Sequence, residues 1–553
     1  MMRRPIKVSL VTHPDDCYGG WVAEACLRSG LLVTHHSSGE LPDLAFTKLI
    51  ILGGKGNLEP KESVRLADWV EMGGTVICLG GTWGLEPVMR LAAETPASTS
   101  RDWILPKQGS PWWPEGIERS AFWGGPRMKS VGADVLMESA TGSVVLSRAG
   151  RWVFFAPHLG QTLGLLAMGA SVENDRVGPG DGSAETLDGV LRAEDGTILD
   201  WEDDRTKPNG GIAAFYEPWA DILAEIWMRV LLSTCDSIAV EPLLSWPWPH
   251  GWEGVATVSI DFGDTDPALA PHLLNTFAKF GIRGAWMAGT KGIPMDVMRL
   301  LKRGDQSLGL LYSGEGGWTN EDFRLEMLAL SRANGVGAMP TARPKNGGWK
   351  GWDRFYSMLA AAGCRVSLSK GGSQSGTSGC LFGTVRPFVP HTFSGKRTDV
   401  LEAPYCVSMP GTSPALAAPL IDMTCAWNGC FHVRLDLSAC KEDGFERGLQ
   451  NLVMLLRQRR LLMMSPDQLG HYELNRRRLQ MKLDENGQGS LSSDGSLPGF
   501  TFLTSPNTSL TKDGNPIAFK DVTRFGRRMR SWSFDLEGKS AVRFAFGAAS
   551  KAA

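Results

Sequence analysis

The chain has 553 residues, more than one hydrophobic core accommodates, so we expect about three domains. Charged residues make up 21% and hydrophobic residues 42%, which is ordinary for a soluble globular protein. The 57 basic residues nearly balance the 59 acidic ones, and this balance argues against a general nucleic-acid or membrane-surface binder.

Neither a signal peptide nor a membrane span is expected. The first residues, MMRRPIKVSLVTHPDD, contain no adequate apolar segment, and no run of about 18 apolar residues occurs anywhere. The ten cysteines are scattered without Cys-x-x-Cys or zinc-type Cys/His spacing, so we expect buried thiols. We therefore expect a cytoplasmic protein with no nucleic-acid and no membrane partner.

Residues 1–240 alternate between strand and helix patterns. Strands are predicted at 6–11, 31–36, 48–54 and 75–81, and helices at 17–30, 58–74 and 211–233. Strands this apolar, separated by helices, indicate a parallel sheet that is covered on both faces. Residues 143–155 predict a β-hairpin with its turn at Ala149-Gly150.

The stretch ADWVEMGGTVICLGGTWGLE resembles glutamine-amidotransferase-like domains, which are flavodoxin-like in topology. That family places a nucleophilic Cys in a tight strand-to-helix turn, and Cys78 is its nearest counterpart here. Cys78 lies inside the predicted strand without a Gly-x-Cys-x-Gly elbow, and His158 is the one tempting base. We expect Cys78 to be buried and inert, and this domain to be a candidate homo-oligomerisation module.

Residues 241–254, EPLLSWPWPHGWEG, are predicted to link this domain to a second series of strands and helices at 255–479. Strands are predicted at 255–260, 282–289, 307–313, 335–340, 364–369, 400–405 and 430–437. Helices are predicted at 268–280, 294–303, 320–333, 351–362 and 443–459. About seven strands with helices between them indicate an irregular (β/α) barrel.

Residues 480–553 are predicted to form a small C-terminal antiparallel β domain. The segments RSWSFDL and SAVRFAF alternate polar and apolar residues on either side of Glu537-Gly538, which predicts a hairpin. The expected fold class is therefore multidomain α/β, with a flavodoxin-like parallel-sheet domain, the barrel and this β domain.

Two stretches of the middle region, VATVSIDFGDTDPALAPHLLNTFAKFGIRGAWMAGT and ARPKNGGWKGWDRFYSMLAAAGCRVSLS, resemble the NodB homology domain of polysaccharide deacetylases. The resemblance implies a hydrolase that holds a divalent metal, usually zinc, with an Asp and two His. It further implies a second Asp as base and a late His as acid.

The metal motif of that family is degenerate in this sequence. Asp261 fits the catalytic Asp, but the next position is Phe262, and the positions of the His pair hold Leu311 and Glu315. The standard zinc site is therefore not present, and the cofactor stays unknown. Asp264 is a weak candidate ligand for another divalent metal.

Several residues at or near predicted strand ends are candidates for the barrel mouth, where barrel active sites form. The catalytic candidates are Asp261, His432 and Arg343, and the substrate-binding candidates are Glu315, Glu402 and Trp427. His432 stands where the late acid does, although a lone His at a strand end is more often structural. Asp266 precedes Pro267 and a helical run, so we interpret it as a helix N-cap.

Three functions remain open from the sequence. The first is a hydrolase of C–N bonds in a carbohydrate or small cyclic substrate, with Asp264 and Glu315 holding Mg²⁺, Mn²⁺ or Ca²⁺. The second is a catalytically inactive deacetylase fold that acts in carbohydrate binding or complex assembly. The third is a glycosidase that pairs Asp261 with Glu315 or Glu402. Each implies a carbohydrate or small-molecule partner.

Overall fold

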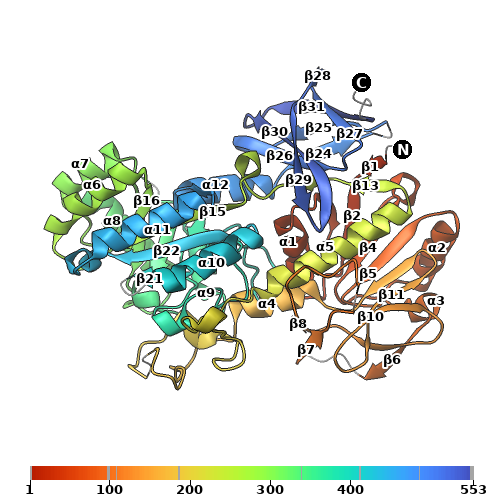
Figure 1. The fold of residues 1–553 in the computed structure, drawn as a ribbon, viewed down its shortest axis with the longest axis horizontal. Helices are drawn as coiled ribbons and strands as arrows, with labels where there is room; N and C mark the ends of the chain where they lie inside the picture. The colour runs from red at the N-terminus through yellow and green to blue at the C-terminus, as the bar shows by residue number, and fades with distance from the viewer. Residues whose placement is uncertain are drawn as a thin grey trace.

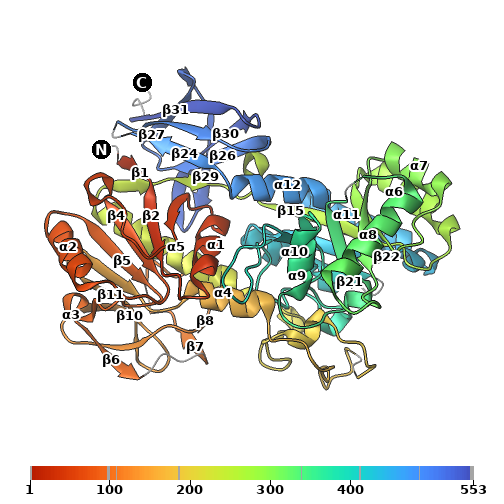
Figure 2. The ribbon, with the colours of Figure 1, turned by 180° about the vertical axis from the view of Figure 1, so that it is seen from behind.

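The computed structural model describes residues 3–548 except 96–99, 108, 185–186, 338, 410–412 and 485. Figures 1 and 2 show three groups of elements: a sheet with helices formed by the N-terminal residues, a curled sheet wrapped by helices, and C-terminal β-sheets that lie beside the first group. No helix within the described ranges is long and apolar enough to cross a membrane.

The N-terminal sheet has seven strands in the order β10-β11-β12-β5-β4-β2-β3. Its strands are β2 (Val8–Thr12), β3 (Val33–His36), β4 (Leu49–Gly53), β5 (Thr75–Leu79), β10 (Asp134–Glu138), β11 (Val144–Ala149) and β12 (Trp152–Phe155). Five neighbouring strands are parallel: β3, β2, β4, β5 and β12. The first of them in the sequence, β2, lies between the second, β3, and the third, β4. This order, 2-1-3-4-5, is one of the two common doubly wound arrangements. The predicted parallel sheet and the β11–β12 hairpin are both confirmed.

Helices cover both faces of this sheet. They are α1 (Gly19–Arg28), α2 (Pro60–Glu71), α3 (Glu86–Met89), α4 (Leu159–Met168) and α5 (Trp219–Ser237). Successive strand residues point to opposite faces, so Ile51 belongs to the core beneath α1, α4 and α5, and Ile50 to the core beneath α2. The α5 helix begins eight residues later than predicted, at Trp219, because the chain before Pro218 is extended.

Short strand pairs complete the N-terminal group. They are β1 (Arg4–Ile6) with β13 (Val240–Pro242), β6 (Leu91–Thr95) with β9 (Arg127–Ser130), and β7 (Arg101–Ile104) with β8 (Ser120–Trp123).

The central sheet is parallel throughout and follows the order β20-β19-β18-β17-β16-β15-β22-β21, with β23 also paired to β15. Its strands are β15 (Gly254–Asp261), β16 (Gly284–Ala288), β17 (Ser307–Tyr312), β18 (Thr341–Pro344), β19 (Val366–Ser367), β20 (Leu401–Glu402), β21 (Val407–Met409), β22 (Cys430–Asp436) and β23 (Leu461–Met463). Residues 401–409 supply both edge strands, so the sheet curls until its two edges are joined by one short segment.

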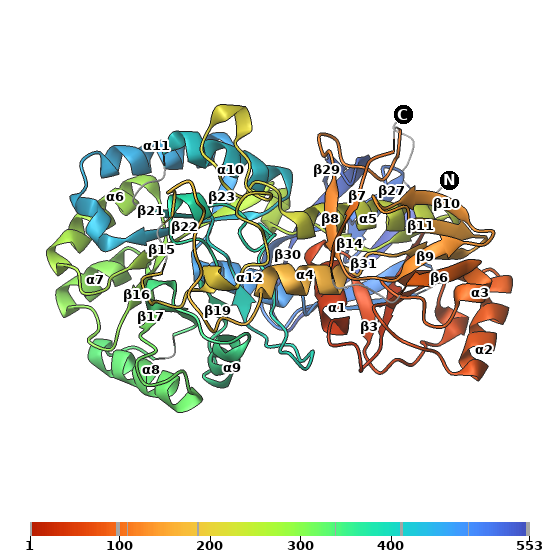
Figure 3. The same ribbon diagram turned by 90° about the horizontal axis from the view of Figure 1, so that it is seen from below.

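Helices surround the curled sheet, as Figure 3 shows from below. They are α6 (Ala270–Phe280), α7 (Met295–Arg303), α8 (Asn320–Asn334), α9 (Arg354–Ala361), α10 (Pro414–Ala426), α11 (Phe445–Gln458) and α12 (Pro466–Arg476). The strand predicted at 335–340 is wrong: α8 ends at Gly335 with a left-handed cap, and pairing starts only at Thr341. Helices α10 and α12 and strands β21 and β23 were not predicted.

The C-terminal residues form two antiparallel sheets. One contains β14 (Leu244–Ser245), β26 (Leu497–Thr504), β29 (Phe519–Arg524) and β30 (Arg527–Leu536); the other contains β24 (Gln480–Leu483), β25 (Gln488–Ser492), β27 (Thr508–Lys512), β28 (Asn515–Pro516) and β31 (Ala541–Ala548). The predicted hairpin at Glu537-Gly538 is wrong, because β30 pairs with β26 and β29 whereas β31 pairs with β25 and β27. The turn at Glu537-Gly538 carries the chain from one sheet to the other. The segment expected to be a linker contributes β14 to the first of these sheets.

Candidate functional site

The interior of the curled sheet is polar where β15 and β22 lie side by side. Both strands alternate polar and apolar residues, and their parallel register places polar side chains on one shared face. The paired residues on this face are Thr257 with His432, Ser259 with Arg434, and Asp261 with Asp436. Asp261 and Asp436 lie at the carboxyl ends of their strands, where a barrel active site would be expected.

Asp261 is held by two arginines. Its side chain is buried, its Oδ1 accepts a hydrogen bond from Arg343 Nη2, and its Oδ2 accepts one of 2.9 Å from Arg434 Nε. Arg343 is fully buried on β18, and Arg434 is partly buried on β22. Charge-assisted hydrogen bonds to both oxygens stabilise the ionised carboxylate and make it a weak proton acceptor.

His432 is joined to the same network through Ser259. Its Nε2 lies 2.8 Å from Ser259 Oγ, and its Nδ1 lies 2.8 Å from the carbonyl oxygen of Ala403. Because a carbonyl only accepts, Nδ1 carries the proton and Nε2 accepts from the serine. Arg343 Nη1 donates to Ser259 Oγ at 2.9 Å and completes the connection to Asp261. Burial lowers the pKa of His432 to about 3, so the ring is neutral at physiological pH.

Glu402 lies on β20, and its carboxylate accepts hydrogen bonds from Tyr356 Oη and from the backbone N–H groups of Ser369 and Lys370. Burial raises the pKa of Glu402 to about 7. The amine of Lys370 points elsewhere: Nζ donates to the carbonyl oxygen of Met168 at 3.0 Å. Burial also lowers the pKa of Lys370 to about 7.

Residues 168–197, apart from 185–186, begin at the last residue of α4 and cover the loops at the carboxyl ends of β18 and β19; Figure 3 shows this part of the chain crossing the end of the curled sheet. Val172 exchanges two backbone hydrogen bonds with Gly351, of 3.0 and 3.1 Å. Glu194 accepts hydrogen bonds from the backbone and the hydroxyl of Ser373. A segment from the N-terminal part of the chain, which we call the covering segment, therefore packs over the loops that follow β18 and β19.

The other candidates lie outside the network. Asp264 is exposed and pairs with Lys291 and Lys345 at 3.4 and 3.2 Å. Glu315 lies in the exposed turn after β17. Trp427 is buried at the end of α10, before β22 begins, so it lies at the end of the sheet opposite to Asp261.

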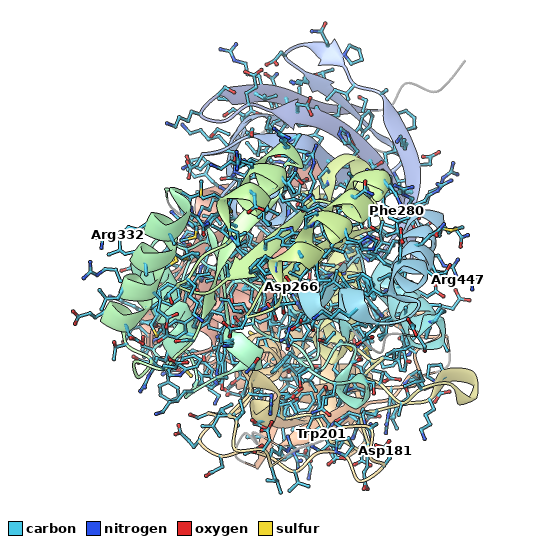
Figure 4. All side chains as sticks on the ribbon, turned by 90° about the vertical axis from the view of Figure 1, so that its left-hand side faces the viewer. Asp181, Trp201, Asp266, Phe280, Arg332 and Arg447 are labelled. Atoms are coloured by element: carbon cyan, nitrogen blue, oxygen red, sulfur yellow. The ribbon has the colours of Figure 1, made fainter. Side chains whose placement is uncertain are left out.

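The helix-cap interpretation of Asp266 is confirmed. Its carboxylate accepts from the N–H of Ala268, two residues on, at the start of the turn that leads into α6. Figure 4 shows Asp266 above Asp181, which belongs to the covering segment, and above Trp201, which follows that segment in the sequence.

The donor set does not fit a metal ion. Across the described part of the chain, no group of three or more His, Cys, Asp or Glu side chains is arranged to hold one. Asp261 has no free oxygen, and Asp264 faces two lysine ammonium groups that compete with any cation.

Cys78 is fully buried in β5, as expected, and burial raises the pKa of its thiol. His158 caps α4: its Nδ1 accepts from the N–H of Gln161, and its Nε2 lies 3.1 Å from Asp16 Oδ2. Both ring nitrogens are therefore occupied, and His158 is not placed to activate a thiol.

Sequence reasoning missed Ser259, Arg434 and Lys370. The first two carry a signal that was available: VSID and HVRLD place a polar residue at every second position of an apolar strand, which indicates a polar interior face. Lys370 lies in a loop without such a pattern, and only the fold brings it to Met168.

No family model and no curated protein matches this sequence. Among solved structures, a Mycobacterium smegmatis protein described as a polysaccharide deacetylase is 14% identical over 40% of this chain and 91% of its own, with a TM-score of 0.30. A family 4 carbohydrate esterase from Bacillus anthracis is 10% identical over 40% of this chain and 85% of its own, with a TM-score of 0.26. A beta-galactosidase from Bacillus circulans sp. alkalophilus is 18% identical over 29% of this chain and 30% of its own, with a TM-score of 0.23.

Likenesses at these TM-scores carry no argument about fold or function. The structure itself defines the class: a multidomain α/β protein with a doubly wound parallel sheet, a curled parallel sheet and two antiparallel sheets. Its function has to be inferred from the side chains.

Proposed function

We propose that this protein binds a carbohydrate or small-molecule ligand without hydrolysing it, and that the deacetylase-like barrel site has become structural. The observation that carries this proposal is the double arginine contact of Asp261, which occupies both oxygens of the one carboxylate at the position of the catalytic base. A general base has to be free to accept a proton from water or substrate. The inactive-fold hypothesis is therefore favoured over the hydrolase and the glycosidase.

The two other parts that deacetylase chemistry needs are also missing. Such hydrolysis uses a metal to activate water and an acid to protonate the leaving amine. The described residues offer no metal-binding group, and the neutral His432 ring, with a pKa of about 3, holds its one proton on Nδ1 against Ala403 and has none on Nε2.

The same proposal extends to the domain organisation. We assign residues 1–240 to a glutamine-amidotransferase-like, flavodoxin-like domain, 255–479 to the NodB-like barrel and 480–553 to a β domain, with 241–254 between the first two. The strand order 2-1-3-4-5 supports the flavodoxin-like assignment. Buried Cys78 and the occupied nitrogens of His158 support a role in assembly over catalysis for the first domain.

The test is acetate release from N-acetylated and O-acetylated oligosaccharides, measured with Zn²⁺, Mn²⁺ or Mg²⁺ added, alongside calorimetric binding of the same oligosaccharides. The expected result is binding of at least one ligand with no acetate release above that of Asp261→Asn. Asp264→Asn is the matched control, because it removes a carboxylate from the rim of the sheet and leaves the network intact. Metal-dependent release that Asp261→Asn abolishes and Asp264→Asn retains would show a working hydrolase.

A further inference from the structure

A cavity of about 440 Å³ lies away from the barrel interior, beside the N-terminal sheet. One wall is the loop after β2 and the first turn of α1, including His13, Asp16 and Gly20. The opposite wall comes from the central part of the chain, through His391 and Arg397. A volume of this size accommodates a monosaccharide-sized ligand.

The loop at 391–397 presents two functional side chains to this cavity. His391 and Arg397 are opposite each other in an antiparallel β-bridge, and Gly395 N–H donates to Thr392 O at the turn between them. Residues paired in this way carry their side chains on the same face of a hairpin. Both side chains also line the cavity, so this face of the hairpin is the one turned into it.

His391 is 4% exposed and has one unused ring nitrogen. Its Nδ1 lies 3.1 Å from the carbonyl oxygen of Val389 and therefore carries the proton, whereas Nε2 contacts no hydrogen-bonding group of any described residue. Burial, followed by the charge of Arg397, lowers the pKa of His391 to about 3. The neutral ring thus offers the cavity a hydrogen-bond acceptor.

Arg397 brings positive charge that is only partly neutralised. Its Nε lies 3.0 Å from Asp399 Oδ1, but Asp399 is shared with Arg478, and Nη2 of Arg397 is buried with no hydrogen-bond partner among the described residues. Lys7 also lines the cavity, and among the described residues its Nζ donates only to the carbonyl oxygen of Met481. The cavity is therefore lined by hydrogen-bond donors that the described residues do not fully use.

The amino end of α1 adds backbone donors at the same place. Its N-cap, Tyr18, makes no side-chain cap, and the N–H groups of Gly20 and Trp21 donate to no described residue. Gly20 permits close packing there, because a Cβ would come within 2.5 Å of the His391 ring. A helix amino end directly after the first strand of a doubly wound sheet favours bound anions.

Two carboxylates also line the cavity, and each is already compensated. Asp16 accepts from the backbone N–H groups of Tyr18 and Lys55 and contacts His158. Glu24 is bound by Arg477 and by the N–H of Val389. Glu24 also attracts the charge of Arg397, but it is shared with Arg477, and Lys7 forms an ion pair with neither carboxylate.

We propose that this cavity binds a small anion that also carries a hydroxyl group, such as a sugar acid or a phosphate, with the anionic group on Arg397 and the amino end of α1 and the hydroxyl donating to His391 Nε2. The site is separate from the Asp261 network, so the proposal does not depend on whether the barrel is active. The ligand contacts both the N-terminal and the central part of the chain, and its binding would hold them together.

Calorimetric titration with D-glucuronate, inorganic phosphate and D-glucose at pH 7 tests this site. The expected result is saturable binding of glucuronate or phosphate and no binding of glucose. The anion that binds more tightly shows whether the site prefers a carboxylate or a phosphate. Arg397→Gln should weaken binding about tenfold or more, because it removes a charge-assisted contact. Arg528→Gln is the control: this exposed arginine pairs with Asp521 and does not line the cavity, so binding should change less than about twofold.

His391→Gln is a second variant that tests the acceptor role. It should weaken the binding of a hydroxylated anion more than the binding of chloride. Circular dichroism verifies the fold of each variant. Dissociation constants weaker than about 1 mM for both anions would overturn the proposal, as would equal losses in Arg397→Gln and Arg528→Gln. Glucose binding as tight as glucuronate binding would also overturn it.

Discussion

The most informative residue is Asp261, because the same contacts that remove it from catalysis make it important for stability. Replacing it with Asn would remove the carboxylate that contacts both Arg343 and Arg434 and leave the two guanidinium groups near one another. Removing one partner of a buried ion pair typically costs about 3 kcal/mol or more. We expect Asp261→Asn to lower the free energy of unfolding in urea by about 3 kcal/mol.

Asp264→Asn is the control for that measurement, since Asp264 is exposed and its pairs with Lys291 and Lys345 are solvated. It should leave the urea midpoint nearly unchanged. A catalytic Asp261 that is strained in the folded protein would behave in the opposite way, and Asp261→Asn would then stabilise the chain.

Lys370 gives a prediction about pH. Burial lowers its pKa from 10.5 to about 7, so between these values the unfolded chain holds a proton that the folded chain has released. Stability from this group therefore rises as the pH increases from 7 towards 10.5 and is lost as the pH falls through 7. Lys370→Met removes the titration and keeps much of the volume. The free energy of unfolding of Lys370→Met, minus that of the unaltered protein, should be more positive at pH 6 than at pH 9.

Urea unfolding of both proteins at these two pH values measures this difference. Glu402, whose pKa is raised to about 7, contributes in the opposite direction, losing stability between pH 4.5 and 7, but it is present in both proteins. A difference that does not change with pH would mean that Lys370 is not titrating near pH 7.

At the scale of elements, the covering segment depends on Gly169. This residue has φ 73° and ψ −163°, a conformation that is essentially restricted to glycine, and a Cβ would lie 2.1 Å from the carbonyl oxygen of Gly196. We expect Gly169→Ala to cost about 3 kcal/mol and to displace the covering segment. Faster amide hydrogen exchange at Gly351, which donates to Val172, would report the displacement.

Gly182→Ala is the matched control, because Gly182 also has a positive φ, of 72°, but an added Cβ would meet nothing within 4 Å. It should lower the free energy of unfolding by about 1 kcal/mol, the cost of a left-handed backbone at a residue that has a Cβ, and leave amide exchange at Gly351 unchanged. Equal effects of the two substitutions would show that Gly169 does not position the segment.

The sequence predicted elements well wherever one of them carried its own pattern. The first parallel sheet, the β11–β12 hairpin and most strands of the central sheet were found from apolar runs and turn residues. Helix α10 was missed because it is apolar on most sides and has Pro419 in its interior. Strands β21 and β23 have three residues each, too few for a periodic signal. The C-terminal hairpin failed because β30 and β31 find partners in different sheets, which adjacent sequence does not reveal.

The candidate site was predicted in part for a similar reason. Asp261, Arg343 and His432 are joined in one network: Asp261 and His432 lie at or next to strands that the sequence predicted, whereas Arg343 lies in β18, which begins after the strand predicted at 335–340. Their state is set by partners distant in sequence, such as Arg434 for Asp261, and no local pattern predicts that pairing. The covering segment and its contact with Lys370 are likewise properties of the tertiary structure alone.

At the scale of the whole molecule, buried ion pairs join the parts of the chain. Glu24 on α1 accepts from Arg477, next to α12, at 3.0 Å and from Val389 N–H at 3.0 Å, and all are buried. Glu225 on α5 accepts from Arg524 in the C-terminal sheet at 2.8 Å. We therefore expect one cooperative thermal transition rather than separate unfolding of each part.

Differential scanning calorimetry of Glu24→Gln tests this coupling. The substitution should lower stability by about 3 kcal/mol, because Arg477 loses one of its two buried carboxylates, and should broaden or split the transition. Glu446→Gln, which removes the exposed partner of Lys279, should change stability by no more than about 0.5 kcal/mol. Two resolved transitions in the unaltered protein would show that the parts are independent.

Asp261 is held by two arginines, and we expect no metal ion to bind there. Elemental analysis of the purified protein after dialysis against zinc measures this directly. We expect no stoichiometric zinc, and the same trace content in Asp261→Ala as in the unaltered protein. About one tightly held zinc ion per chain, lost in Asp261→Ala, would instead indicate a metal-dependent hydrolase.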